Sequence, residues 1–172
     1  MSAGIMQTHP SSASRLVSVA LPLVLAVAGE ALAARYDPLV VDVPMPPSHL
    51  DLTAHDVARA RDIPLRVYLP TNTAPAPVIL FSHGLGGSRT GSAFLGQHWA
   101  AHGYVAVFLQ HPGSDESVWK NKPMQDRMRA MNQAAPLDNF RLRVRDVPAV
   151  LNQLEFWNAD KANPLARRLD LK

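Results

Sequence analysis

Two short apolar runs, residues 78–81 and 104–109, enclose the part of the sequence that most restricts the fold. Seven of the nine glycines lie between Gly84 and Gly113, in and around that region. Uncharged runs of this length, bounded by turn residues, predict strands that are buried on both faces. Residues 92–102 have helical spacing, and Gly103 follows where a left-handed residue usually ends a helix. Strand, glycine loop, helix and strand in this order predict a βαβ unit with two parallel strands.

The flanking residues extend this unit. Four apolar side chains alternate with other residues and predict a strand with one buried face: Ile63, Leu65, Val67 and Leu69. Residues 48–56 are expected to form a strand before it, and residues 56–62 a hairpin connection. Residues 121–135 and 139–158 are expected to be helical, with Pro148 bending or restarting the second helix and Asp146 as a cap. The expected fold is α/β, a mostly parallel sheet with flanking helices.

The first 47 residues divide into two further segments. Residues 16–29 are uncharged, and Ala31 and Ala33 form a small-residue cleavage site after them. This pattern is typical of a secretory signal peptide, and the run is short for a membrane span. We expect residues 1–33 to direct export to the periplasm or the extracellular space; the alternatives are an uncleaved anchor or a buried helix. Residues 34–47, rich in proline, are expected to form an extended arm. Residues 48–172 are then the folded domain.

Composition excludes several classes of protein. The 172 residues contain 17 Lys and Arg against 14 Asp and Glu, a net charge of +3, without a basic run that would follow phosphates. Nucleic acid is therefore not an expected partner, and contact with a membrane is expected only through the export signal. The chain has no cysteine, which excludes disulfides, thiolate metal sites and a cysteine nucleophile within these residues.

Residues 82–91 are comparable with three kinds of glycine loop. A dinucleotide-binding loop fits Gly84 and Gly86, but Arg89 stands where the third glycine is needed. A phosphate-binding P-loop fits the spacing of residues 86–91, but Ser92 follows directly and the lysine is missing. An oxyanion loop, His-Gly-x-Gly-Gly after a buried strand, fits both the loop and its surroundings. No cofactor is expected.

Residues 77–89 and 103–115 together resemble the α/β-hydrolase superfamily, and within it the platelet-activating-factor acetylhydrolases and bacterial predicted dienelactone hydrolases. The resemblance extends over residues 50–172. It implies a serine esterase, in which a serine attacks the carbonyl of a small-molecule or lipid ester and a His/Asp pair moves the protons. It also implies that the backbone N–H of Leu85 stabilises the oxyanion, with its neighbour Gly86 as a second candidate donor.

The chain departs from this family in one respect. The family's nucleophile lies in a Gly-x-Ser-x-Gly elbow, with the acid and base later still, and this sequence contains no such elbow. We therefore expect the N-terminal part of an exported ester hydrolase, an incomplete α/β-hydrolase fold without turnover by itself. The alternative is a non-catalytic secreted α/β binding module or an inactive remnant.

Other polar and sulfur-containing residues have simpler interpretations. The polar residues and glycines of the two loops are expected to brace those loops: His83, Gly84, Gly87, His111 and Asp115. A local catalytic triad that includes Ser88 or Ser114 is not expected. Asp115 is expected to cap the segment after it. His98 and His102 lie four residues apart, but with no third ligand we expect an ordinary helix surface and no metal. Met124, Met128 and Met131 are either core residues or a mobile cover over an ester pocket.

Overall fold

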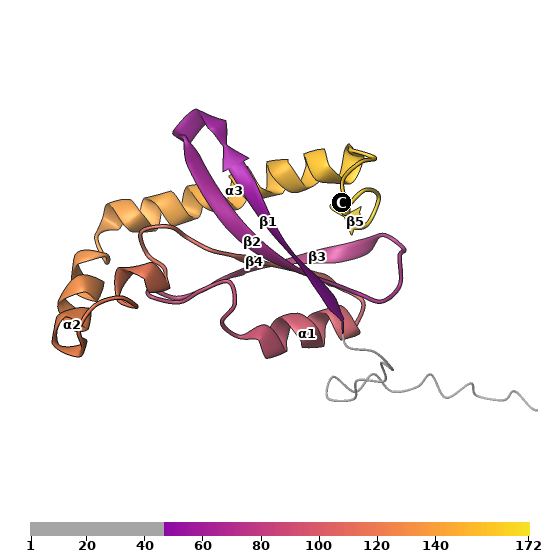
Figure 1. Cartoon of the computed structure of the whole chain (residues 1–172). Coiled ribbons are helices and arrows are strands. Elements are labelled where there is room, and N and C mark those ends of the chain that lie inside the picture. The colour runs from indigo at the N-terminus through magenta and orange to yellow at the C-terminus, as the bar shows by residue number, and fades with distance from the viewer. Residues whose placement is uncertain (1–46) are drawn as a thin grey trace, which may run out of the picture. The chain divides into compact units, whose positions relative to one another are not determined.

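A computed structural model describes residues 47–172 and contains one sheet with helices on both faces (Figure 1). The signal segment expected at residues 1–33 and, except for Pro47, the arm expected at residues 34–47 lie outside the described residues. The elements, in chain order, are β1 (Ser48–Asp56), a 3-10 turn (Val57–Arg59), β2 (Arg61–Leu69), β3 (Ala76–Ser82), α1 (Ala93–Ala101), β4 (Val105–Leu109), a second 3-10 turn (Glu116–Val118), α2 (Met124–Gln133), α3 (Leu137–Ala159) and β5 (Leu169–Asp170).

The strands form one mixed sheet in the order β1-β2-β4-β3-β5. β1, β2 and β4 are antiparallel neighbours, whereas β3 is parallel to both β4 and β5. The parallel β3-α1-β4 unit is the βαβ unit predicted from the sequence. The sheet as a whole is mixed rather than mostly parallel, because β1 and β2 are joined by a short connection that requires antiparallel pairing.

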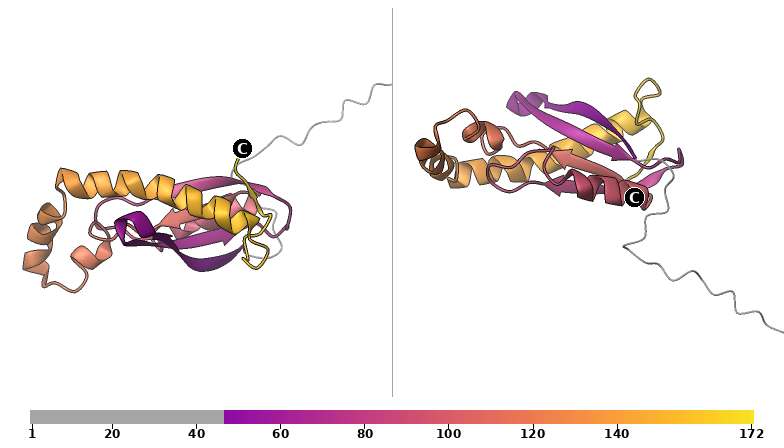
Figure 2. Two further views of the ribbon diagram at one scale, coloured as in Figure 1. Left: turned by 90° about the horizontal axis from the view of Figure 1, so that it is seen from above. Right: turned by 60° about the horizontal axis from the view of Figure 1, so that its bottom comes forward.

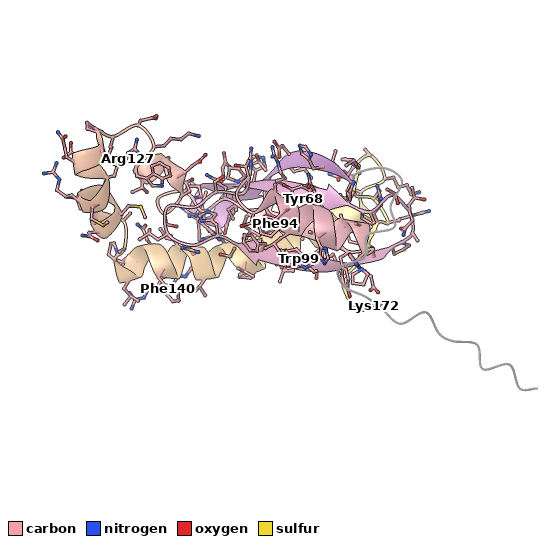
Figure 3. All side chains as sticks on the ribbon, turned by 90° about the horizontal axis from the view of Figure 1, so that it is seen from below. Tyr68, Phe94, Trp99, Arg127, Phe140 and Lys172 are labelled. Carbon is pink, nitrogen blue, oxygen red and sulfur yellow. The ribbon has the colours of Figure 1, made fainter. Side chains whose placement is uncertain are left out.

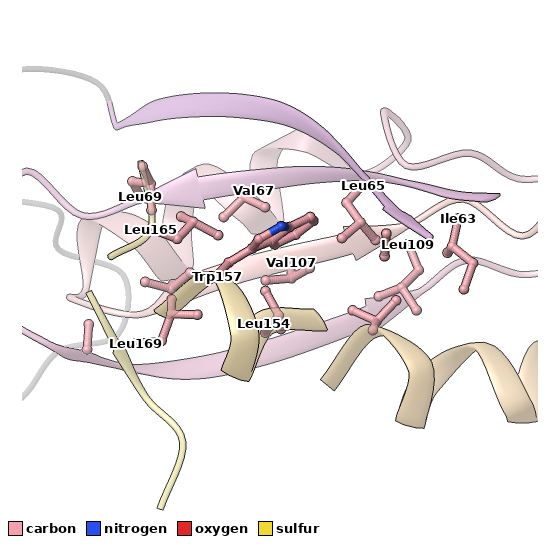
Figure 4. Close-up of a cluster of buried hydrophobic side chains, with 14 residues drawn as sticks. Ile63, Leu65, Val67, Leu69, Val107, Leu109, Leu154, Trp157, Leu165 and Leu169 are labelled. Carbon is pink, nitrogen blue, oxygen red and sulfur yellow. The ribbon is translucent and has the colours of Figure 1, made fainter. Parts of the chain in front are cut away.

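Alternate residues of β4 face the two helix layers, which lie on opposite faces of the sheet (Figure 2). Ala106 and Phe108 pack with Tyr68 and Ala100 on the side of α1, where Trp99 also lies (Figure 3). On the other face, α3 covers a larger core. Its members include residues of β2 and β4 together with Val150, Leu154, Trp157, Leu165 and Leu169 (Figure 4). The four alternating apolar residues predicted for β2 are all buried, but Tyr68 on the opposite face is buried as well, so burial in β2 is not confined to the one face expected.

Two expectations about strands and helices are corrected. Residues 78–81 of β3 are only partly buried, because β5 pairs with Ala76 and Pro77 alone and the rest of that edge has no partner among the described residues. α3 continues through Pro148 from Leu137 to Ala159, so this proline neither ends nor restarts the helix. Packing of α3 on the sheet outweighs the missing backbone hydrogen bond.

Two polar side chains of α3 point toward the sheet, and one of them, Asp146, differs from expectation. Asp146 is fully buried and does not cap a helix. Arg143 reaches back to the end of β3. Both side chains therefore connect the helix to the polar loops of the sheet, where the candidate site lies.

Candidate active site

The loops after β3 and β4 lie side by side at one edge of the sheet, since parallel strands end at the same edge. The Gly86 N–H donates to the Ser114 carbonyl at 2.8 Å, and the Glu116 N–H donates to the Gly87 carbonyl at 2.7 Å. Gly87 and Asp115 also form an isolated β-bridge. The glycine-rich loop is therefore held by backbone hydrogen bonds to the loop after β4.

His83 is buried beneath this loop with both ring nitrogens occupied. Nδ1 lies 2.7 Å from the Gly84 carbonyl, and Nε2 accepts the His111 N–H at 3.2 Å. A carbonyl only accepts and an N–H only donates, so the ring is neutral with its proton on Nδ1. Burial lowers the pKa of His83, in agreement with a neutral ring. In this geometry His83 has no nitrogen left to act as a base or a metal ligand.

His111 lies between a serine and a carboxylate. Its Nε2 is 2.8 Å from Ser82 Oγ, and its Nδ1 is 2.9 Å from Asp146 Oδ2. The imidazole and the carboxylate are both fully buried, whereas Ser82 is exposed at the end of β3. Sequence reasoning singled out His111 but missed both of its partners, because it placed Ser82 in the glycine-rich loop without a role and predicted Asp146 to be a helix cap.

Asp146 is balanced by two arginines from the β1–β2 hairpin. Arg61 Nε lies 2.8 Å from Oδ1 and Arg59 Nη2 lies 3.0 Å from the same oxygen. Burial opposes ionisation, but hydrogen bonds from His111 and Arg61 keep the pKa of Asp146 below its ordinary value. The buried group is therefore a carboxylate, and it joins the hairpin, α3 and the loop after β4.

Arg143 adds a cation at the exposed end of this network. Its Nη2 donates to Ser82 Oγ at 3.2 Å and also to the His83 carbonyl. Ser82 is therefore held from two sides, by the His111 ring and by the Arg143 guanidinium.

The other serines and Asp115 occupy structural positions. Ser88 Oγ is hydrogen-bonded to Thr90 at 2.6 Å, and the Ser114 hydroxyl donates to the His111 carbonyl at 3.4 Å. Asp115 accepts the Ser117 N–H at 3.1 Å, which is the capping role expected from the sequence. These residues do not place a serine against a base.

Among the described residues, the N–H of Leu85 is free, whereas the N–H groups of the two residues after it are both used. The Gly86 N–H is used by Ser114, and the Gly87 N–H donates to the Gly84 carbonyl at 3.0 Å. The Leu85 N–H makes no hydrogen bond to any residue of the described segment 47–172. Leu85 also lines a cavity of about 170 Å³. The other lining residues are Ser114 in the loop after β4, residues 134–136 between α2 and α3, and residues at the start of α3.

Gly86 is a position where glycine is required. Its φ is +74°, and a Cβ would lie 2.6 Å from the Met131 side chain and 2.9 Å from Trp119 Nε1. The indole N–H of Trp119 donates to the Gly86 carbonyl at 2.7 Å. Of the three methionines, Met131 thus contacts the loop, while Met124 and Met128 are exposed rather than core residues.

The rings of His98 and His102, at the end of α1, are tilted by 40° to each other with centroids 4.3 Å apart. Within residues 47–172 there is no group of three or more potential metal ligands, and none of the helices described there is long and apolar enough to cross a bilayer.

A mixed sheet with helices on both faces and a His-Gly-x-Gly-Gly loop after a parallel strand defines a protein of the α/β-hydrolase superfamily. Residues 60–155, more than half of the chain, match the family described as platelet-activating factor acetylhydrolase, isoform II, and the chain belongs to that family.

Solved structures of esterases and related hydrolases are similar in part. A dienelactone hydrolase from Anabaena variabilis is 11% identical, with 69% of this chain and 48% of that chain covered and a TM-score of 0.43. A ferulic acid esterase from Streptomyces cinnamoneus is 14% identical, with 77% of this chain and 52% of that chain covered and a TM-score of 0.46. The chain thus spans about half the length of these structures. No curated protein matches it.

Proposed function

We propose that this chain is the N-terminal part of an exported serine hydrolase of carboxylic esters, and that it supplies the oxyanion donor from Leu85. Membership of the acetylhydrolase family supports ester hydrolysis as the reaction class. In this proposal the elbow serine and its His/Asp pair belong to a part of the enzyme that follows residue 172.

The free N–H of Leu85 is the observation that carries the proposal. In acyl transfer, backbone N–H groups stabilise the negative charge that develops on the carbonyl oxygen, and they must be held in place beforehand. The hydrogen bonds of Gly86 and Gly87 hold the loop on both sides of Leu85. Gly86, the second candidate, already donates to Ser114, so of the two candidates the geometry favours Leu85.

The adjoining cavity supports a small-molecule or lipid ester as the substrate. Its lining is mainly apolar and includes Phe140 from α3, with Arg143 as the one charged side chain. An apolar pocket beside a backbone donor suits an acyl chain whose carbonyl oxygen points to the donor.

Replacement of Leu85 in the complete hydrolase tests this proposal. Leu85→Pro removes the N–H, and because the donor acts mainly in the transition state, kcat should fall by about 10²–10³ with a smaller change in KM. Leu85→Ala is the matched control, since it shortens the side chain but keeps the N–H, and its kcat should stay close to that of the wild type. A folded Leu85→Pro enzyme with unchanged kcat would exclude Leu85 from the oxyanion hole.

Export rests on residues 1–33, outside the described residues, and has its own test. Cleavage after Ala33 should give a mature protein that begins at Ala34 in the exported fraction, because small residues at positions 31 and 33 fit the signal peptidase pattern. N-terminal sequencing of protein from a bacterial host checks this, and Ala33→Arg should block processing. Recovery of only unprocessed protein from the wild-type sequence would argue against export by this route.

A further inference from the structure

Ser82, His111 and Asp146 form a continuous chain of side-chain hydrogen bonds outside the oxyanion loop. The distances are 2.8 Å from Ser82 Oγ to His111 Nε2 and 2.9 Å from His111 Nδ1 to Asp146 Oδ2. A nucleophile within about 2.6–3.2 Å of a base, with the base oriented by a third group, is the geometric signature of an activated serine. Such a set is recognised by geometry and roles, since its order in the chain varies among unrelated folds.

The hydrogen bonds also determine where the protons lie. A carboxylate only accepts, so His111 carries its proton on Nδ1, and in the neutral ring Nε2 accepts from the Ser82 hydroxyl. Arg143 only donates, so its bond to Ser82 Oγ at 3.2 Å leaves the hydroxyl proton directed at His111. This is the tautomer in which an imidazole takes the proton of a serine.

A reactive serine needs a buried, oriented base and a hydroxyl that is open to the reagent, and the three residues differ in exposure accordingly. His111 and Asp146 have no exposed surface, and Arg59 and Arg61 keep the carboxylate ionised. Ser82 lies at the end of β3 and is exposed, so a reagent can reach its oxygen. The Arg143 guanidinium beside Oγ adds positive charge where negative charge develops on the attacking oxygen or its acceptor.

We propose that Ser82 is an activated nucleophile that accepts an acyl or phosphonyl group from an activated ester, with His111 as its base and Asp146 orienting that base. The proposal goes beyond the proposed function, in which the nucleophile is an elbow serine outside this chain. With an aryl ester, Ser82 Oγ bonds to the carbonyl carbon and the bond from carbon to the aryl oxygen breaks. The Ser82 proton passes to His111 Nε2 and then to the leaving phenolate.

The proposal concerns formation of the acyl-serine, which is a single event per chain, and it agrees with the expectation that the chain does not turn over by itself. A fluorophosphonate is the direct probe, since its reaction stops at this stage. Ser82 Oγ then bonds to phosphorus, fluoride leaves, and the proton goes through His111 to water.

The experiment treats the 172-residue chain with a fluorophosphonate and follows the intact mass, then locates the adduct by peptide mapping. One adduct per chain, on Ser82, is expected. A positioned base typically contributes about 10²–10⁴-fold, so labelling of the folded chain should be at least about 100-fold faster than labelling of the chain unfolded in urea. Ser82→Ala should abolish the adduct.

Ser117→Ala is the matched control. Ser117 is also exposed, and its hydroxyl is bonded at 2.5 Å to a carboxylate, Asp115, without an imidazole between them. Its replacement should leave both the rate and the site of labelling unchanged. An absence of any adduct, an adduct on another residue, or equal rates for the folded and unfolded chains would each overturn the proposal. These results are independent of the Leu85 test, which measures turnover.

Discussion

At the residue scale, Asp146 is the buried carboxylate that connects the polar side chains around the site. Its carboxylate binds Arg59 and Arg61 from the hairpin and His111 from the loop after β4, while its own backbone belongs to α3. Three parts of the fold that are distant in sequence thus meet at one buried charge. Removing a partner from such a group leaves the remaining charges uncompensated, which costs more than the loss of an exposed ion pair.

Asp146→Asn should therefore destabilise the protein by about 3–5 kcal/mol, because the substitution keeps the shape but removes the charge opposite two arginines. Asp138→Asn is the matched control on the same helix. Asp138 is exposed and pairs with Arg141 at 3.3 Å, so its loss should cost at most about 1 kcal/mol. Urea unfolding followed by circular dichroism measures both. Similar small losses for the two variants would show that the buried carboxylate does not stabilise the fold.

At the element scale, α1 approaches the sheet closely because Gly96 faces it. A Cβ at Gly96 would overlap the buried Tyr68 ring, and Trp99 and Phe108 close the same cluster. Glycine in the middle of a helix costs about 0.5–1 kcal/mol relative to alanine, so its position here is explained by packing. The short distance between helix and sheet also fixes where the glycine-rich loop enters α1.

Gly96→Val should lower the free energy of unfolding by about 1–3 kcal/mol, since the added side chain forces Tyr68 or the helix to move. Gln97→Val introduces the same side chain at the next, exposed position of α1 and should change stability by less than about 1 kcal/mol. Thermal or urea unfolding of the two variants provides the comparison. If Gly96→Val were as stable as Gln97→Val, the close approach of α1 would not be a packing requirement.

At the scale of the whole described domain, two apolar surfaces have no cover. Residues 78–82 of β3 have an edge without a partner among the described residues, and that edge contains neither charge nor proline up to Ser82. α3 exposes Phe140 and Val144, whereas Leu154 of the same helix is fully buried in the core with residues of β2 and β4. An open apolar strand edge beside exposed apolar side chains favours association.

Isolated residues 34–172 should therefore be dimeric or prone to aggregation, because pairing at the β3 edge satisfies backbone groups and covers Val144 and its neighbours. Size-exclusion chromatography across a range of concentrations, together with thermal melting, checks this. A concentration-independent monomer with a cooperative transition above about 50 °C, typical of stable mesophilic domains, would contradict it.

Local patterns along the chain were sufficient to predict the β3-α1-β4 unit, the four alternating apolar residues of β2 and the left-handed Gly103, whose φ is +86°. Apolar periodicity and glycine conformation act over a few residues, so they can be seen in a sequence. Leu85 was identified in the same way, from a motif that directly follows a strand. The half-buried state of residues 78–81 could not be predicted, because it depends on which strand pairs with β3.

What the sequence by itself determined is the α/β class, the loop that carries Leu85 and the absence of an elbow serine. What only the tertiary structure decided is the set of contacts between distant residues. Asp146 lies 35 residues after His111 and 85 after Arg61 in the chain, yet it contacts both. Such contacts depend on how α3 crosses the sheet, and no local pattern encodes that crossing, so Asp146 and Ser82 became candidates only once the fold was known.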